Sequence, residues 1–385
     1  MSNPVYLDNA ATTPLDSRVL EAMLPHLQGR RGNASSLHAS GAAALDAVEE
    51  ARGSVAAFLG AVPDEVVFTG GGTEADNIAV LGLAAVNPEK RHLAVSRIEH
   101  PAVRLAAEHL ERRGYEVSWV DVDENGLVDP ERFAAALRPD TALAAVMWAN
   151  NEVGTVQPIE ELAVICEERG VPLHVDAVQS AGRIAVNVSS IPISTLAISG
   201  HKLYGPQGVG ALYVRQGVRV APTVFGGGQE HGVRSGTHNV SGIAGLGEAA
   251  RLAAEELDER VAHEKSLRDR ILAGVESIPG VRLNGHARQR LSNNAHLFVE
   301  GVEAEGLVLL CDALGFEIGS GSACASGGHK ASPVLLAMGF GEQEAFSVVR
   351  VTVGKDNTAQ EIDGFIEAFA TAVARLRELS PLYAG

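Results

Sequence analysis

Short hydrophobic runs alternate with amphipathic segments through the middle of the chain. The segments between the runs carry apolar residues at helical spacing, as in Ala102–Arg113 and Ile159–Glu168. This alternation predicts an α/β fold with a mainly parallel, doubly wound sheet, which binds its ligand at the carboxyl ends of the strands. The seven expected strands are Val66–Thr69, His92–Ser96, Val117–Val120, Leu143–Trp148, Leu173–Val175, Leu196–Ser199 and Gly210–Val214.

The alternation stops at the glycine-rich segment Phe225–Glu230. A long helix, three strands and two helices are expected after it, at Gly242–Val275, Asn294–Val299, Glu305–Ala313, Phe316–Ile318, Val348–Val353 and from Thr358 onward. This second pattern predicts a smaller α+β domain at the C-terminal end. We therefore expect a large domain over residues 15–258 and a small domain made of residues 1–14 and 259–385. The N-terminal segment Tyr6–Thr13 is expected to pack near the functional site.

Composition and charge exclude several classes of partner. The 385 residues are 46% hydrophobic and 21% charged, and the formal net charge is −17. An acidic chain of this kind is not expected to bind nucleic acid directly or to attach to an anionic membrane. No apolar run approaches the roughly 18 residues that a membrane span needs. The first residues show no signal-peptide pattern, so a cytoplasmic protein is expected.

The three cysteines lie in different surroundings. Cys166 and Cys311 fall in apolar helical patterns and are expected in the core. Cys324 falls among glycine, serine and alanine, where no helix or strand face accounts for it. It is either a reactive thiol or an incidental loop thiol. An odd, unclustered set argues against a disulfide framework and against a cysteine metal site, and no metal is predicted.

A glycine-rich segment, Gly70–Glu74, follows one expected strand and begins an amphipathic helix. Glycines there let backbone N–H groups approach an anion, and a helix N-terminus favours negative charge. The segment lacks the Lys-Ser/Thr pair of a Walker A loop and the glycine spacing of a dinucleotide fingerprint. It is therefore either a phosphate cradle or a tight strand-to-helix turn.

Titratable side chains follow three other strands. Lys202 comes after Leu196–Ser199 and can form a Schiff base if it is partly desolvated, although most loop lysines are simply solvated. Asp176 ends a strand and needs a partner, which a protonated ring nitrogen, a metal or a helix N-terminus would provide. His100 follows a third strand and is either a ring-stacking imidazole or a helix cap.

Together these features fit pyridoxal phosphate (PLP) better than any other common cofactor. Lys202 would bind it covalently, and Asp176 would keep its pyridine nitrogen protonated so that the ring accepts electrons. The loop from Gly226 to Thr237 would add a phosphate contact or act only as a hinge.

The ordered motifs resemble those of the group I cysteine desulfurases of the NifS/IscS type, class V members of the fold-type I PLP-dependent transferases. The resemblance covers nearly the whole chain. The motifs that carry it are Tyr6–Pro14, Asn33–His38, Phe68–Glu74, Ala149–Thr155, His174–Gln179, Ser199–Pro206, Gly226–Glu230, Arg234–Thr237 and Ser320–Cys324.

The resemblance implies a role for each matching residue. Lys202, Cys324 and His100 would be catalytic: Lys202 holds the cofactor and shuttles protons, and Cys324 attacks the sulfur of L-cysteine to give alanine and a persulfide. Substrate would be bound by Asn9, Asn150 and Arg350. The cofactor would be bound by Gly72, Thr73, His100, Asn150, Asp176, Gln179, Ser199, His201, Lys202 and, from the other subunit of a homodimer, Thr237.

The persulfide must then pass to a sulfur-acceptor protein, such as an iron–sulfur scaffold or a tRNA-thiolation relay. Two other activities suit the same scaffold, those of a class V aminotransferase and of a selenocysteine lyase. A catalytically idle partner that kept the fold is a third possibility. An aminotransferase would not need Cys324, so that residue discriminates between the readings.

Overall fold

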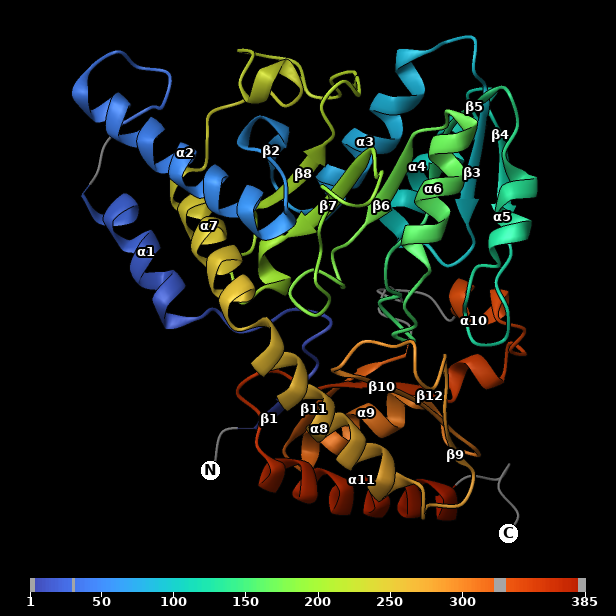
Figure 1. The fold of residues 1–385 in the computed structure, drawn as a ribbon. Helices are drawn as coiled ribbons and strands as arrows, with labels where there is room; N and C mark the ends of the chain where they lie inside the picture. The colour runs from blue at the N-terminus through green and yellow to red at the C-terminus, as the bar shows by residue number, and fades with distance from the viewer. Residues whose placement is uncertain (1–3, 30–31, 322–329, 380–385) are drawn as a thin grey trace.

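The computed structural model describes residues 4–29, 32–321 and 330–379. A seven-stranded sheet forms the larger part of the molecule (Figure 1). Six of its strands run in one direction and β8 runs against them. The mainly parallel seven-stranded sheet predicted from the sequence is confirmed. In spatial order the strands are β2 (Val66–Thr69), β8 (Gly210–Val214), β7 (Thr195–Ser199), β6 (Leu173–Asp176), β5 (Thr141–Ala145), β3 (His92–Ser96) and β4 (Glu116–Val120).

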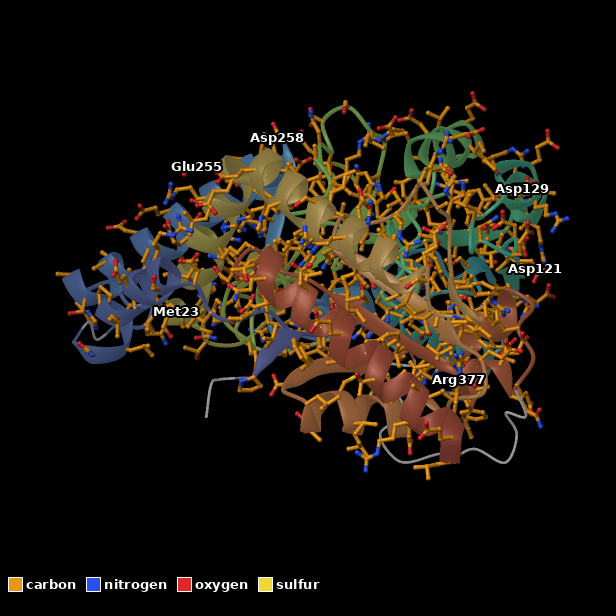
Figure 2. The ribbon with its side chains drawn as sticks, turned by 90° about the horizontal axis from the view of Figure 1, so that it is seen from below. Met23, Asp121, Asp129, Glu255, Asp258 and Arg377 are labelled. Atoms are coloured by element: carbon orange, nitrogen blue, oxygen red, sulfur yellow. The ribbon has the colours of Figure 1, made fainter. Side chains whose placement is uncertain are left out.

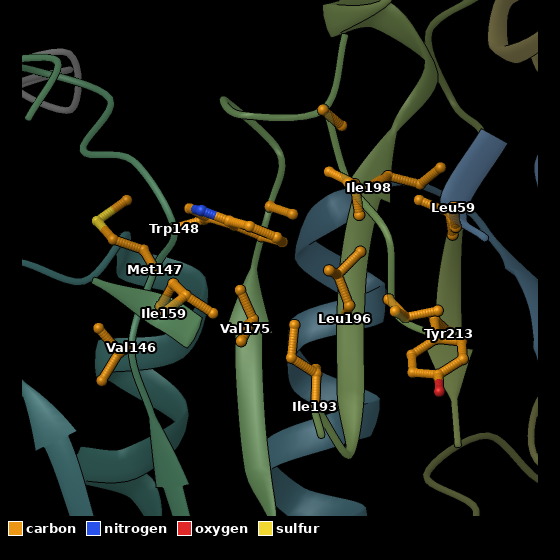
Figure 3. Packing of buried hydrophobic residues seen from close by; sticks show 14 of the residues in the cluster. Leu59, Val146, Met147, Trp148, Ile159, Val175, Ile193, Leu196, Ile198 and Tyr213 are labelled. Carbon is orange, nitrogen blue, oxygen red and sulfur yellow. The ribbon is translucent and has the colours of Figure 1, made fainter. Parts of the chain in front are cut away.

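Helices cover both faces of this sheet, which is why its strands read as continuous hydrophobic runs. On one face, α3 (Gly72–Val86) and α4 (Pro101–Glu111) pack on residues such as Leu93 and Leu143. On the other face, Val175 and Leu196 belong to the largest hydrophobic cluster, part of which Figure 3 shows. The helices that contribute to this cluster include α1 (Ser17–Gln28), α2 (Ala39–Leu59), α5 (Pro130–Ala136), α6 (Ile159–Arg169) and α7 (Val240–Glu255).

A five-stranded sheet organises the smaller part, drawn below the large sheet in Figure 1. Its core joins Leu7 from the N-terminus to Phe365 and Phe369 near the C-terminal end. The strand order is β1 (Val5–Leu7), β11 (Phe316–Ser320), β12 (Val348–Thr352), β10 (Asn294–Val299) and β9 (Val281–Leu283). Its helices are α8 (Leu257–Val275), α9 (Ala304–Ala313) and α11 (Ala359–Leu379); the short α10 (Pro333–Ala337) packs instead on the large cluster. Single 3-10 turns occur at Pro63–Glu65, Gly200–Lys202, Glu230–Gly232 and Glu344–Phe346.

Two predicted elements differ from the structure by more than two residues at an end. The single helix expected at Gly242–Val275 is two helices, because Glu256 leaves helical geometry with φ −104° and ψ 9°. Figure 2 marks this junction with Glu255 and Asp258, and it lies close to the domain boundary predicted from the sequence, which stays a prediction. The strand expected at Leu143–Trp148 ends at Ala145. The hydrophobic run continues beyond the end of the strand because Val146 and Trp148 are still buried. Their backbone N–H groups donate to carbonyl groups of β6.

Within the described ranges, no helix combines the length and the apolarity that crossing a membrane would require.

Candidate active site

A cavity of about 900 Å³ lies at the carboxyl ends of β2, β6 and β7. The large sheet supplies most of its lining, while Ala10–Thr12 and Arg350 come from the N-terminal segment and from β12 of the small sheet. The expectation that the N-terminal segment lies near the site is confirmed. Most of the residues singled out in the sequence line this cavity: Gly72, Thr73, His100, Asp176, Gln179, Ser199, His201, Lys202 and Arg350.

The turn between β2 and α3 has the geometry of an anion cradle. Gly71 has φ +145°, a conformation that side chains rarely allow, and it directly precedes the first turn of α3. A Cβ added to Gly72 would lie 2.6 Å from Cγ2 of Val178. Backbone N–H groups at a helix N-terminus bind phosphate. Thr73 and Ser199 add hydroxyl groups to the same wall of the cavity.

Lys202 ends the turn that follows β7, and its ammonium group is held by backbone carbonyls. Nζ donates to the carbonyls of Ala10 and Ala11, the second at 2.8 Å. Burial, and then the nearby Arg350 and Arg183, lower its pKa to about 7. A large fraction of the amine is therefore unprotonated near neutral pH and able to act as a nucleophile.

Asp176 and His100 lie close together in the cavity, with one ligand atom of each within 4.8 Å of the other. Asp176 is the last residue of β6 and accepts a hydrogen bond from the N–H of Val178 at 2.9 Å. Burial raises the pKa of its carboxyl group, although His100 and Lys202 oppose that shift. His100 caps α4, because its Nδ1 accepts from the N–H of Ala102 at 3.1 Å, so Nε2 carries the proton of the neutral ring. Burial lowers the pKa of this imidazole.

Gln179 and His201 are held by the N-terminal segment. Nε2 of Gln179 donates to the carbonyl of Ala10 at 2.9 Å, and Nδ1 of His201 lies 3.1 Å from Oγ1 of Thr12. Burial, and then Lys202, lower the pKa of His201 to about 4, so its ring is neutral at pH 7. A neutral imidazole can donate one hydrogen bond to a phosphate without changing the charge of the cavity.

The residues that line the cavity match the chemical groups of PLP. The cradle and Ser199 suit its phosphate, Lys202 suits its aldehyde, and Asp176 suits a protonated ring nitrogen. Asp76, His100 and Asp176 also bring three metal-ligating atoms within 4.8 Å of one another. Lys202 and Arg350 line the same cavity and favour an anion there, so a cation is the poorer match.

Arg350 is anchored as a substrate-binding residue would need to be. It is 2% exposed, and its guanidinium donates to the carbonyl of Asn151 and to Asp8, both at 2.8 Å. Its Nε is buried without a hydrogen-bond partner among the described residues.

Asn150 and Asn9 do not line the cavity. The Asn150 side chain is fully buried, donating to the carbonyl of Ile98 and accepting from the N–H groups of Glu152 and Val153. Asn9 donates to the carbonyl of Thr352. The cavity is lined instead by Asn151, which the sequence analysis missed. The adjacent asparagines indicated that a side-chain amide could lie at the site, but only the folded turn decides which of the two lines the cavity.

One further predicted residue lies elsewhere, and another is outside the described residues. Thr237 is exposed and does not line the cavity of its own chain. Cys324 lies outside the described residues, which resume at Lys330. Cys166 and Cys311 are buried free thiols, as expected, and burial raises the pKa of each to about 12.

The chain is similar over its whole length to proteins of known family. The family Aminotransferase class-V matches residues 5–365. "Cysteine desulfurase IscS" of Neisseria meningitidis is 46% identical over 387 residues, covering all of this chain and 95% of that protein. "Cysteine desulfurase IscS 1" of Archaeoglobus fulgidus is 44% identical, covering 98% of this chain and 99% of that one.

Solved structures show the same fold. A structure described as a NifS-like protein superposes with a TM-score of 0.91 at 35% identity, covering 97% of this chain and all of that one. The structure described as "SspA in complex with cysteine" has a TM-score of 0.81 at 34% identity, covering 92% of this chain and all of that one. The chain therefore belongs to the PLP-dependent class V aminotransferase family and, within it, to the cysteine desulfurases.

Proposed function

We propose that this chain removes sulfur from L-cysteine and holds it as a persulfide on Cys324. The observation that carries the proposal is the convergence of Lys202, Asp176 and Thr73 on one cavity that Arg350 enters from the other sheet. Kinship with cysteine desulfurases over the full length supports the same reaction. An aminotransferase or a selenocysteine lyase has no comparable support among these relatives.

Four residues and the cofactor each have a separate role in the proposed reaction. Bound PLP supplies an electron sink that weakens bonds at the substrate's α- and β-carbons. Arg350 binds the substrate carboxylate, and Nζ of Lys202 takes and returns protons at the substrate carbons. Asp176 holds the proton at the pyridine nitrogen. Sγ of Cys324 bonds to the substrate sulfur while the substrate's C–S bond breaks, so one sulfur atom moves and no external oxidant enters.

We also propose that the enzyme is a homodimer. Thr237 lies on an exposed loop away from its own cavity, and Phe225 on the same loop is 83% exposed. Leu37 is fully exposed as well. The main support for a dimer is that Thr237, to which the family resemblance assigns a phosphate contact, does not line the cavity of its own chain. An acceptor protein for iron–sulfur assembly or tRNA thiolation, and a cytoplasmic location, remain predictions.

Trapping the persulfide tests the proposed reaction. After incubation with L-cysteine, the peptide containing Cys324 should gain the mass of one sulfur atom, with alanine formed in equal amount. Peptides containing Cys166 and Cys311 serve as internal controls and should stay unchanged, because both thiols are buried. Keto-acid formation with unmodified Cys324, or alanine release at an unchanged rate by Cys324→Ser, would contradict the proposal.

Replacing Arg350 with lysine tests how the substrate carboxylate is bound. Lysine keeps the positive charge but loses the planar fork that can hold a carboxylate by two hydrogen bonds. We expect kcat/KM for L-cysteine to fall about 10- to 100-fold, mainly through KM, because one charged hydrogen bond is lost. The absorption spectrum of the bound cofactor should not change. A spectrum that changes while KM stays constant would place Arg350 at the cofactor rather than at the substrate.

A further inference from the structure

A second buried carboxyl group, Asp76, lies beside Asp176. Asp76 comes from α3 and Asp176 from β6, and they are 1% and 4% exposed. Ligand atoms of Asp76, Asp176 and His100 all lie within 4.8 Å of one another. Two carboxylates this close in a buried site repel each other strongly, so both are not expected to be charged at once.

Asp76 is connected to a histidine that lies behind the cavity wall. Nε2 of His174 is 3.2 Å from Oδ1 of Asp76, and Nδ1 of His174 is 3.0 Å from Oγ1 of Thr195. His174 is fully buried, and burial lowers its pKa to about 3, so the ring is neutral and carries one proton. That proton lies either on Nε2, facing a charged Asp76, or on Nδ1, facing Thr195.

The charges around Asp76 and Asp176 favour the arrangement in which the His174 proton lies on Nδ1 and Asp76 is uncharged. Glu99 is a third carboxyl group buried nearby, and burial raises its pKa to about 8, so these surroundings disfavour a charged carboxylate at Asp76. A negative charge is better stabilised on Asp176 than on Asp76, because Asp176 accepts a hydrogen bond from the N–H of Val178 and interacts with His100 and Lys202. Asp76 has only the ring of His174 as a hydrogen-bond partner among the described residues. Burial and the nearness of Asp176 raise the pKa of Asp76 well above its usual range.

We propose that Asp76 is a positioning residue that stays protonated and donates its O–H to Nε2 of His174. His174 then donates from Nδ1 to Thr195, which fixes the tautomer of the ring. A neutral Asp76 leaves Asp176 as the one charged carboxylate of the pair beside the pyridine nitrogen of bound PLP. The proposal rests on the proposed function, because it uses the pairing of Asp176 with that nitrogen.

Asp76→Asn tests the protonation state directly. An asparagine amide donates to Nε2 of His174 as a protonated carboxyl would, so cofactor affinity and the cofactor's absorption spectrum should stay within about threefold and unshifted. The infrared difference spectrum, wild type minus variant, should contain the C=O stretching band of a protonated carboxyl group. Nitrogen NMR of His174 should report the Nδ1–H tautomer in both proteins. Absence of that band, or loss of cofactor affinity in this variant, would overturn the proposal.

The apoprotein gives a second readout that needs no cofactor. A carboxyl group protonated in the folded state ionises in the unfolded state above its ordinary pKa, so wild-type stability falls as pH rises. Asparagine at position 76 cannot ionise in the unfolded state. The Tm of Asp76→Asn minus the wild-type Tm should therefore increase from about pH 5 to about pH 8. A Tm difference that is constant with pH would contradict a neutral Asp76.

Asp176→Asn separates this inference from the proposed function. That variant should lose most of its cofactor affinity, because the ring nitrogen loses its charged partner. If Asp176→Asn binds PLP normally, the proposed pairing fails, whatever Asp76→Asn does. If only Asp76→Asn departs from expectation, the proposed function stands and the protonated Asp76 does not.

Discussion

Lys202→Ala is expected to lower the rate of alanine formation by on the order of 10⁴-fold, because one residue both binds the cofactor and moves protons. The backbone carbonyls of Ala10 and Ala11 that receive its ammonium group show that the position is built for this side chain. The measurement is single-turnover alanine release from purified holoenzyme. The variant should also lose the absorption band of covalently bound PLP.

Lys265→Ala is the matched control, since Lys265 is a 62%-exposed lysine on α8 that pairs with Asp269. It should keep the wild-type rate. In the wild-type apoprotein, cofactor capture should accelerate as pH rises towards about 7 and then level off, because the amine of Lys202 loses its proton near that pH. A pH-independent capture rate, or a Lys202→Ala enzyme with unchanged turnover, would exclude the assigned role.

Glu230→Gln is expected to destabilise the fold by about 3 kcal/mol, because the buried guanidinium of Arg52 loses its buried carboxylate partner and keeps only the half-exposed Glu49. Arg52 and Glu230 have side chains that are 5% and 1% exposed and form two hydrogen bonds of 2.8 Å. Glu230 also accepts from the N–H of Phe68 and contacts His238. Its backbone has φ +50°, so the network holds a left-handed residue in the loop that leads to Thr237.

The pH dependence of stability follows from the same carboxylate. Its neighbours, despite burial, lower the pKa of Glu230 from 4.5 to about 2 in the folded state. The contribution of the Glu230 carboxylate to the free energy of unfolding is therefore complete above about pH 4.5 and is lost as pH falls towards 2. Urea unfolding of Glu230→Gln should lack this acid-dependent loss.

Glu49→Gln is the control for Glu230→Gln, because Glu49 contacts the same arginine but is 51% exposed. It should cost no more than about 1 kcal/mol, as exposed ion pairs do. Equal losses of unfolding free energy in the two variants would contradict the buried network.

The site residues that could be predicted are those whose chemistry is local. A strand end, a glycine turn and a helix start are readable from neighbouring residues, so Thr73, Asp176 and Lys202 were placed correctly in one cavity. Arg350 was assigned through the family resemblance, and the packing of β12 against the N-terminal segment explains how it reaches the cavity.

Residues that depend on register or on packing could not be predicted. Asn150 and Asn151 are adjacent and identical in type, and only the turn after β5 turns the first into the core and leaves the second at the cavity. Asp76 lies three positions beyond Thr73 on a helix, with no sign in the sequence that His174 faces it. The break at Glu256 likewise appears only where α7 packs on α2 while α8 packs on the small sheet.

The sequence by itself determined the alternation of strands and helices, the acidic net charge, and the order of cofactor-binding motifs, because each is encoded in the spacing and type of residues along the chain. The tertiary structure decided which side chains share the cavity, which carboxyl group has the charge, and which lysine loses its proton. Those properties arise from burial and from distances between residues far apart in the chain, as between Lys202 and Arg350, which spacing along the sequence does not encode.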